Sequence, residues 1–141
     1  MHEHAHPLYN IGIDSPLGDI PEEARPMWSW IVSDENYRKE YHDTLSQLAN
    51  IIETDAFKNE VYKISGLIMP YVEKEPKPFF TKEAFQKAKD TLVTFVELRA
   101  ESVRKQLTNE LAARSEDQDR KDRINASHIT VTVMGTIPES K

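Results

Sequence analysis

Apolar residues recur at steps of three and four along three stretches of the chain, and this spacing predicts amphipathic helices. The three stretches cover residues 37–52, 57–72 and 85–111. A shorter apolar run, Met27 to Ile31, follows Pro26, and proline is accepted in the first turn of a helix. We therefore expect a short helix over residues 27–33 and three longer helices, of which the last extends through residue 113. At 1.5 Å per residue, that last helix would be about 45 Å long.

Each of the three longer helices has a candidate N-cap directly before it. Asp34 precedes the first, Thr54 or Asp55 the second, and Thr81 the third. Side-chain oxygens of these residue types accept hydrogen bonds from the backbone N–H groups that the start of a helix leaves unpaired. We expect these residues to fix where the helices begin.

Helix breakers and charge runs mark the boundaries between the predicted elements. Prolines and glycines crowd residues 1–26, which we interpret as an extended lead-in. Gly66 and Pro70 predict a weakened or kinked end of the second long helix. Residues 114–123 hold no apolar side chain, which favours a charged linker. The predicted organisation is a lead-in (1–26), a helical domain (27–113), a charged linker (114–127) and a tail with a strand (128–137).

The strand prediction rests on alternation near the C-terminus. Ile129, Val131 and Val133 alternate with other side chains up to Gly135, a pattern typical of a half-buried strand. A single strand leaves its backbone groups unpaired, so it needs a partner in residues 9–13, in another chain or in a missing part of this one. The expected fold class is therefore mainly α, with one C-terminal β-strand.

Composition and charge exclude several classes of protein. The chain has 141 residues, enough for one domain, and its net charge of -6 argues against a broad nucleic-acid-binding surface. No apolar run approaches the roughly 20 residues that span a bilayer, so we expect no membrane contact. The N-terminus lacks the basic and apolar regions of a signal peptide. Cysteine is absent, which excludes disulfides, thiolate metal sites and a cysteine nucleophile.

Motifs that would name a reaction are missing from the sequence. Four scattered glycines cannot form a glycine-rich phosphate loop, and neither a Gly-x-Ser-x-Gly elbow nor a His-Glu-x-x-His helix occurs. The alternating His2, His4 and His6 could bind a transition metal, but no rigid second shell is visible around them, so a terminus that binds metal weakly is the better explanation and we assign no metal site. The acidic pairs Glu22/Glu23, Glu73/Glu75 and Asp117/Asp119 lie in turns or charged tracts, where solvation is the default.

Three further features have both a functional and a structural interpretation. His42 lies off the apolar stripe of its helix, which indicates an exposed surface position without a partner. Trp28 and Trp30 could form an aromatic ligand platform with neighbouring tyrosines, although core packing explains them more simply. Arg99 lies on the apolar stripe of the longest helix, and a buried guanidinium needs a carboxylate or carbonyl beside it, so we expect a structural ion pair.

Several segments, taken in order, resemble one known family. They are Ile13-Asp14-Ser15-Pro16-Leu17, Arg25-Pro26-Met27-Trp28-Ser29-Trp30-Ile31, Tyr37 to His42, Pro70-Tyr71-Val72-Glu73-Lys74, Phe79 to Phe85, Leu98 to Leu107 and Asn125 to Gly135. Their order and spacing resemble the C-terminal part of the CotH family, the spore coat protein H-like atypical protein kinases. The resemblance covers roughly residues 10–137.

The resemblance implies a divergent kinase-like fold in a spore-coat or extracellular protein. Members of that family use ATP and a divalent metal to phosphorylate Ser-rich coat proteins. Their metal-binding Asp, nucleotide-binding Lys and catalytic Asp precede the Ile-Asp-Ser-Pro-like segment, and this chain has none of those motifs. Phosphoryl transfer depends on positioned metal, cation and base, so we expect this chain alone to be inactive. We assign it no catalytic, cofactor-binding or metal residue.

Two functional hypotheses follow. In the first, the chain is the C-terminal helical segment of a CotH-like kinase, occurring as a fragment, a split gene product or a degenerate remnant. Its partners would then be an upstream kinase core and, by resemblance, spore coat proteins. In the second, the chain is a stand-alone helical module without enzymatic activity, which docks another protein chain through the Trp28/Trp30 end or the terminal strand.

Overall fold

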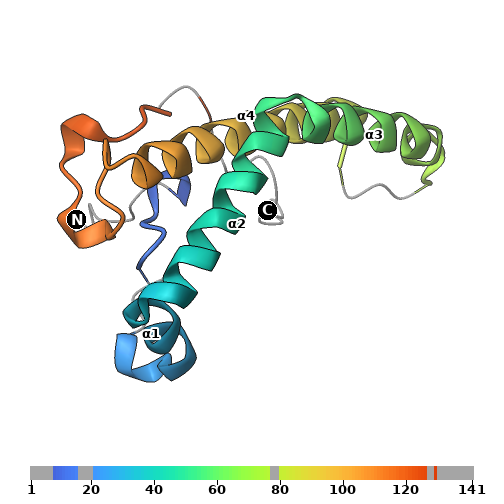
Figure 1. The fold of residues 1–141 in the computed structure, drawn as a ribbon. Helices are drawn as coiled ribbons and strands as arrows, with labels where there is room; N and C mark the ends of the chain where they lie inside the picture. Colours follow the sequence, from blue (N-terminus) through green and yellow to red (C-terminus); the bar gives the residue numbers. More distant parts are fainter. Residues whose placement is uncertain (1–7, 16–20, 77–79, 127–128, 130–141) are drawn as a thin grey trace.

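The computed structural model describes residues 8–15, 21–76, 80–126 and 129 (Figure 1). Its α-helices are α1 (Pro26–Ser33), α2 (Glu35–Glu53), α3 (Ala56–Lys74) and α4 (Lys82–Leu107). Short 3-10 helices are η1 (Leu8–Asn10), η2 (Glu22–Ala24), η3 (Ser115–Asp117) and η4 (Arg120–Asp122). No strand occurs in these described ranges, and the predicted mainly helical fold is confirmed.

Two of the predicted N-caps are confirmed in detail. The Asp34 carboxylate accepts hydrogen bonds from the backbone N–H groups of Asn36 at 2.9 Å and Tyr37 at 3.1 Å. The Thr81 hydroxyl accepts one from the N–H of Ala84 at 3.1 Å. These bonds satisfy donors that the first turns of α2 and α4 would otherwise leave unpaired. The sequence therefore located both helix starts correctly.

The cap prediction for α3 is wrong. Asp55 stands at the N-cap position, but it adopts a left-handed conformation with φ of 61° and its side chain accepts no bond from the helix. The Thr54 hydroxyl donates backwards to the carbonyl of Ile51 at 2.9 Å. With only two residues between α2 and α3, the chain reverses through the positive φ of Asp55, a conformation that Asp tolerates better than most residues.

One predicted helix end agrees with the structure and one does not. Helix α3 includes Gly66 and Pro70 and ends at Lys74, two residues after the predicted apolar stripe, and the weakening or kink expected there stays a prediction. Helix α4 ends at Leu107 rather than at residue 113. Asn109 takes a left-handed φ of 61°, which turns the chain away from the helix axis and places Leu111 in the core with 1% of its surface exposed.

The helices form an open arrangement rather than a parallel bundle. Helix α2 crosses α4 near its middle, α3 folds back beside the N-terminal half of α4, and α1 lies at the far end of α2 (Figure 1). The core lies where α2 and α4 meet the N-terminal segment and the residues after α4. Its buried hydrophobic members are Tyr9, Ile13, Val32, Ala49, Val93, Ala100, Val103, Leu111, Ile124 and Ala126.

The charged stretch after α4 returns to this core. It contains η3 and η4, and Gln118 and Ile124 within it are buried. The division of the chain into a lead-in, helical domain, linker and tail stays a prediction. Of the predicted strand only Ile129 is described, and the terminal histidines lie outside the described residues. Within the described helices, none combines the length and apolar character that crossing a bilayer requires.

Candidate functional site

The N-terminal segment, residues 9–15, is held against α4 by polar side chains of that helix. Gln106 is the central one: its Oε1 accepts a hydrogen bond from the N–H of Ile13 at 2.7 Å. Its Nε2 donates to the carbonyl of Ile11 at 3.2 Å and to the hydroxyl of Ser102 at 3.1 Å. Both backbone groups lack a regular secondary-structure partner, so the Gln106 amide replaces one.

Arg99, about two turns before Gln106 on α4, contacts the same segment. Its Nη1 donates to the carbonyls of Tyr9 at 3.2 Å and Ile11 at 2.5 Å. The expected ion pair is wrong, because no described carboxylate lies within ion-pair distance of this guanidinium. Burial lowers the pKa of Arg99, as desolvation penalises a charge that carbonyl dipoles compensate only in part.

Asn10 ties the segment to the residues that follow α4. This side chain is fully buried, with Nδ2 donating to the carbonyl of Ile124 at 2.9 Å. Its Oδ1 accepts from the N–H of Ile124 at 3.1 Å and from the hydroxyl of Ser102 at 3.3 Å. One amide therefore pairs both backbone groups of a residue that is 114 positions away. The sequence signal for this cluster was the row of polar residues at 99, 102 and 106 interrupting an apolar helix face.

Helix α2 contacts the segment from the other side. The Tyr41 hydroxyl donates to the carbonyl of Ile13 at 2.9 Å, and His42 Nε2 lies 2.7 Å from the Asp14 carboxylate. The expectation that His42 is an exposed residue without a partner is therefore wrong. Its partner is 28 positions earlier, in a segment without helical periodicity, so local spacing could not reveal it. Burial, followed by the nearby Asp14 charge, raises the pKa of Tyr41.

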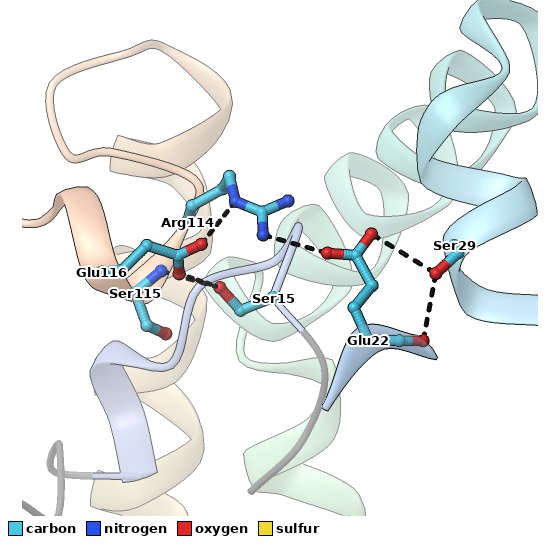
Figure 2. A network of polar contacts seen from close by, with 6 residues as sticks. All are labelled: Ser15, Glu22, Ser29, Arg114, Ser115 and Glu116. Atoms are coloured by element: carbon cyan, nitrogen blue, oxygen red, sulfur yellow. Dashed lines mark hydrogen bonds and ion pairs between the residues drawn. The ribbon is translucent and has the colours of Figure 1, made fainter. Parts of the chain in front are cut away.

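A second polar network joins the end of the segment to α1 and η3 (Figure 2). Arg114 bridges two carboxylates, Glu22 at 3.2 Å and Glu116 at 2.6 Å. The Ser15 hydroxyl donates to Glu116 at 3.1 Å, and Ser29 donates to Glu22. The pKa of Glu116 is lowered, first by its own backbone N–H and then by Arg114 and Ser15. These partly exposed contacts each add little stability but fix the orientation of η2 and α1.

A pocket of about 290 Å³ opens beside the segment. Residues 11–13 and 15 form one side of it, and Arg25, Trp28, Tyr41 and Arg99 form the rest. The edge of Trp28 packs against Tyr41 with ring centroids 5.5 Å apart at 87°. The pocket therefore combines apolar walls with two guanidinium groups, the composition typical of small binding sites.

The two tryptophans have different environments. Trp28 is half-buried at the pocket, and its indole N–H is buried without a hydrogen-bond acceptor. Trp30 is 61% exposed, and its ring contacts that of Tyr37 with 5.0 Å between ring centroids. Core packing was therefore the wrong expectation for Trp30. The four aromatic residues form two separate pairs rather than one platform.

Potential metal ligands do not gather in the described part of the chain. No group of three His, Asp or Glu side chains within the described ranges could hold a metal ion. The carboxylates near the pocket are already engaged, Asp14 by His42 and Glu22 by Arg114. We therefore assign no step of phosphoryl transfer to these residues.

Comparison with known proteins gives one positive result. Searches of curated proteins and of solved structures return no match to the chain. The family model described as CotH kinase protein matches residues 9–103, from the buried Tyr9 to the Val103 of α4. The matched range contains the N-terminal segment, α1 to α3 and most of α4, including Arg99 and Ser102. This chain belongs to the CotH kinase protein family.

Proposed function

We propose that this chain is the C-terminal helical part of a CotH-family protein kinase and that it supports the catalytic part without carrying catalytic residues. ATP-dependent phosphorylation of coat or extracellular proteins would then belong to the whole protein. The chain itself would supply a rigid surface onto which an upstream kinase core packs. Its location would be the spore coat or an extracellular site, as for the family.

The observation that carries this proposal is an imbalance between the core and the exposed apolar surface. The described core contains ten hydrophobic residues, of which three are alanines. Twelve large hydrophobic residues are instead exposed, among them Met27 at 77% and Tyr71 at 76%. Monomeric proteins expose few contiguous apolar patches, and larger ones mark interaction sites. A helical body with this distribution fits a part that another polypeptide covers.

The exposed apolar residues concentrate on α3. Four of them share one side of the helix, and we call this set the α3 face; its members are Ile64, Leu67, Ile68 and Tyr71. Tyr62 lies on the other side of the helix, where Lys89 of α4 lies over its ring. Helix α3 lies on the arm that projects away from the polar cluster, beside the N-terminal half of α4 (Figure 1). Ser65 is the one buried residue of α3 in the described structure, so α4 covers little of its apolar surface. The α3 face is therefore the surface we expect an upstream core to cover.

Association and phosphate transfer test the proposal together. The chain would be mixed with the separately produced upstream region of a CotH-family protein, and binding would be measured by calorimetry. Transfer from labelled ATP to a Ser-rich acceptor would be followed with magnesium or manganese. We expect binding and a gain of transfer activity in the mixture, and no transfer by the chain alone. Transfer by the chain alone would contradict the proposal.

Matched variants locate the contact. Leu67→Glu places a charge on the α3 face at an exposed position, so its effect on the stability of the chain should be small. Asn59→Glu introduces the same charge at an exposed position on another side of α3 and is the matched control. We expect Leu67→Glu to weaken binding to the upstream region at least tenfold, while Asn59→Glu leaves it within about twofold. Equal binding by both variants would exclude the α3 face.

The alternative, a stand-alone interaction module, is favoured by one separate observation. Met27 and Trp30 on α1, together with Tyr37 on α2, form a second exposed apolar patch far from the α3 face. A module would bind an unrelated protein through this patch and confer no kinase activity on an upstream region. Binding without a gain of phosphate transfer, together with loss of binding in Trp30→Glu, would support the module instead.

A further inference from the structure

The pocket beside the N-terminal segment has an unbalanced charge. Arg25 and Arg99 both line it, and no described carboxylate does so. The chain as a whole carries a net charge of -6, so a pocket with two cations and no anion runs against its overall composition. Arg99 is partly buried, and removing its charge from water without a counter-charge is unfavourable, whereas Arg25 is exposed and keeps its charge hydrated.

Each of the two arginines lacks a carboxylate for a different reason. The Nη1 atom of Arg99 donates to the carbonyls of Tyr9 and Ile11. These carbonyls are neutral dipoles, so the positive charge of Arg99 is not neutralised. The Arg25 guanidinium has no hydrogen-bond or ion-pair partner among the residues that the structure describes. Two acidic groups of the neighbouring segments are engaged elsewhere, Asp14 by His42 and Glu22 by Arg114.

The walls of the pocket define the rest of the ligand. Ile11, Ile13 and the rings of Trp28 and Tyr41 make most of its lining apolar. The indole N–H of Trp28 is itself buried, so the ring presents apolar surface to the pocket and its N–H resonance reports on the pocket wall. A volume of about 290 Å³ is at the lower end of small-molecule sites, too small for a nucleotide and sufficient for one side chain. An anionic head on a short apolar stem matches the two arginines, the apolar walls and the volume.

We propose that this pocket receives the carboxylate of a glutamate or aspartate side chain from the polypeptide that covers the chain. The inference rests on the proposed function, because it names how the upstream core would be anchored. The carboxylate would lie between Arg25 and Arg99, with its methylene groups against Trp28 and Tyr41. Such an anchor combines charge-assisted hydrogen bonds with apolar burial, the combination found at interface hot spots.

The pocket can be tested without the upstream region. The probe is N-acetyl-glutamate N-methylamide, added to the full chain, with N-acetyl-glutamine N-methylamide as the neutral control. Binding is followed through the indole N–H resonance of Trp28 in ¹⁵N-labelled protein, assigned with Trp28→Phe and Trp30→Phe. We expect a saturable shift of the Trp28 resonance with the glutamate probe, no comparable shift with the glutamine probe, and no response from Trp30. Equal binding of both probes would overturn the proposal.

Arginine variants identify the anchor. We expect Arg25→Gln to weaken binding of the glutamate probe about tenfold or more, the effect of losing a hydrogen bond between charged groups. Arg120→Gln, an exposed arginine on η4 outside the pocket, is the matched control and should bind as the unmodified chain does. Arg99→Lys is the second test, although it also affects the carbonyls of Tyr9 and Ile11. An unchanged affinity in Arg25→Gln would overturn the proposal.

Two further measurements distinguish the proposed carboxylate from other anions that the pocket could bind. Inorganic phosphate that binds more tightly than the glutamate probe would make this a phosphate site and refute the carboxylate anchor. Asp19 lies in the sequence between Ser15 and Arg25, which both line the pocket. If Asp19→Asn binds the glutamate probe more tightly than the unmodified chain does, the carboxylate of Asp19 competes with the probe, and the proposal is refuted. None of these measurements contains the upstream region. Failure of the pocket and failure of the proposed function are therefore distinguishable.

Discussion

Replacing Asn10 by alanine should destabilise the chain more than any surface change. The substitution removes the partner of the Ile124 N–H, the Ile124 carbonyl and the Ser102 hydroxyl. Leaving a buried backbone group unpaired is unfavourable by about 1–3 kcal/mol. If Ile124 stays in place, two unpaired backbone groups together set the loss at roughly 2–6 kcal/mol.

The chain can also respond by releasing the residues around Ile124 into water. Water would then pair the backbone, but the burial of the Ile124 side chain would be lost, which is worth about 1.5–3 kcal/mol. The chain takes whichever response is less unfavourable, so we expect the free energy of unfolding to fall by about 1.5–3 kcal/mol. With a urea m-value of about 2 kcal/mol/M, the midpoint should fall by about 0.75–1.5 M at unchanged m.

Urea denaturation followed by circular dichroism measures this loss, and amide hydrogen exchange locates it. The Ile124 amide should become the most strongly accelerated one in Asn10→Ala. Asn59→Ala, at an exposed position of α3, is the control and should change the free energy of unfolding by less than about 0.5 kcal/mol. A midpoint within about 0.3 M of the unmodified chain, with unchanged exchange at Ile124, would refute the view that Asn10 holds the two ends together.

Three further predictions test other parts of the fold. Gly12→Ala should destabilise the chain by at least about 2 kcal/mol, because a Cβ there would lie 2.5 Å from the Ala113 carbonyl oxygen and the Ser115 nitrogen. At Gly66 a Cβ would meet nothing within 4 Å, so Gly66→Ala should stabilise the chain by about 0.5–1 kcal/mol. Thermal melts of both variants check these opposite signs. Thr81→Ala should lower the free energy of unfolding by about 1 kcal/mol, measured in urea, and Thr81→Ser should restore most of it. The pKa of Tyr41 is raised in the folded chain, so its contribution to stability is complete below the unfolded pKa of about 10 and is lost as pH rises through the folded pKa. Absorbance at 295 nm should show one tyrosine that ionises at higher pH than the others, and this transition should be absent in Tyr41→Phe.

The helices could be predicted because their signals are local. Asp34 and Thr81 lie next to the backbone groups that they cap, and apolar spacing of three and four residues reports directly on one helix face. The wrong predictions occur where the backbone leaves the helical geometry. Asp55 and Asn109 both take a left-handed φ of 61°, and periodicity carries no information about a single residue of that kind.

The candidate site could not be predicted for a different reason. Its bonds join residues far apart in the sequence, such as Asn10 with Ile124 and Ile13 with Gln106. The residues at one end of each bond lie in segments without regular structure, where no period indicates which side chain faces which. Arg99 was identified because a cation on an apolar helix face is anomalous by itself. The nature of its partners, carbonyls rather than a carboxylate, depended on the fold of residues 9–13.

The site and the exposed surfaces together argue that stability and association are divided between different parts of the chain. Polar side chains of α4 satisfy the backbone of the N-terminal segment, which fixes the end of the molecule where the pocket lies. The α3 face lies on the opposite arm and contributes little to the core. Changes in Asn10 or Gln106 should therefore reduce folding and partner binding together. Changes in Leu67 or Arg25 should reduce binding alone, because these two residues are exposed and hold no backbone group in place.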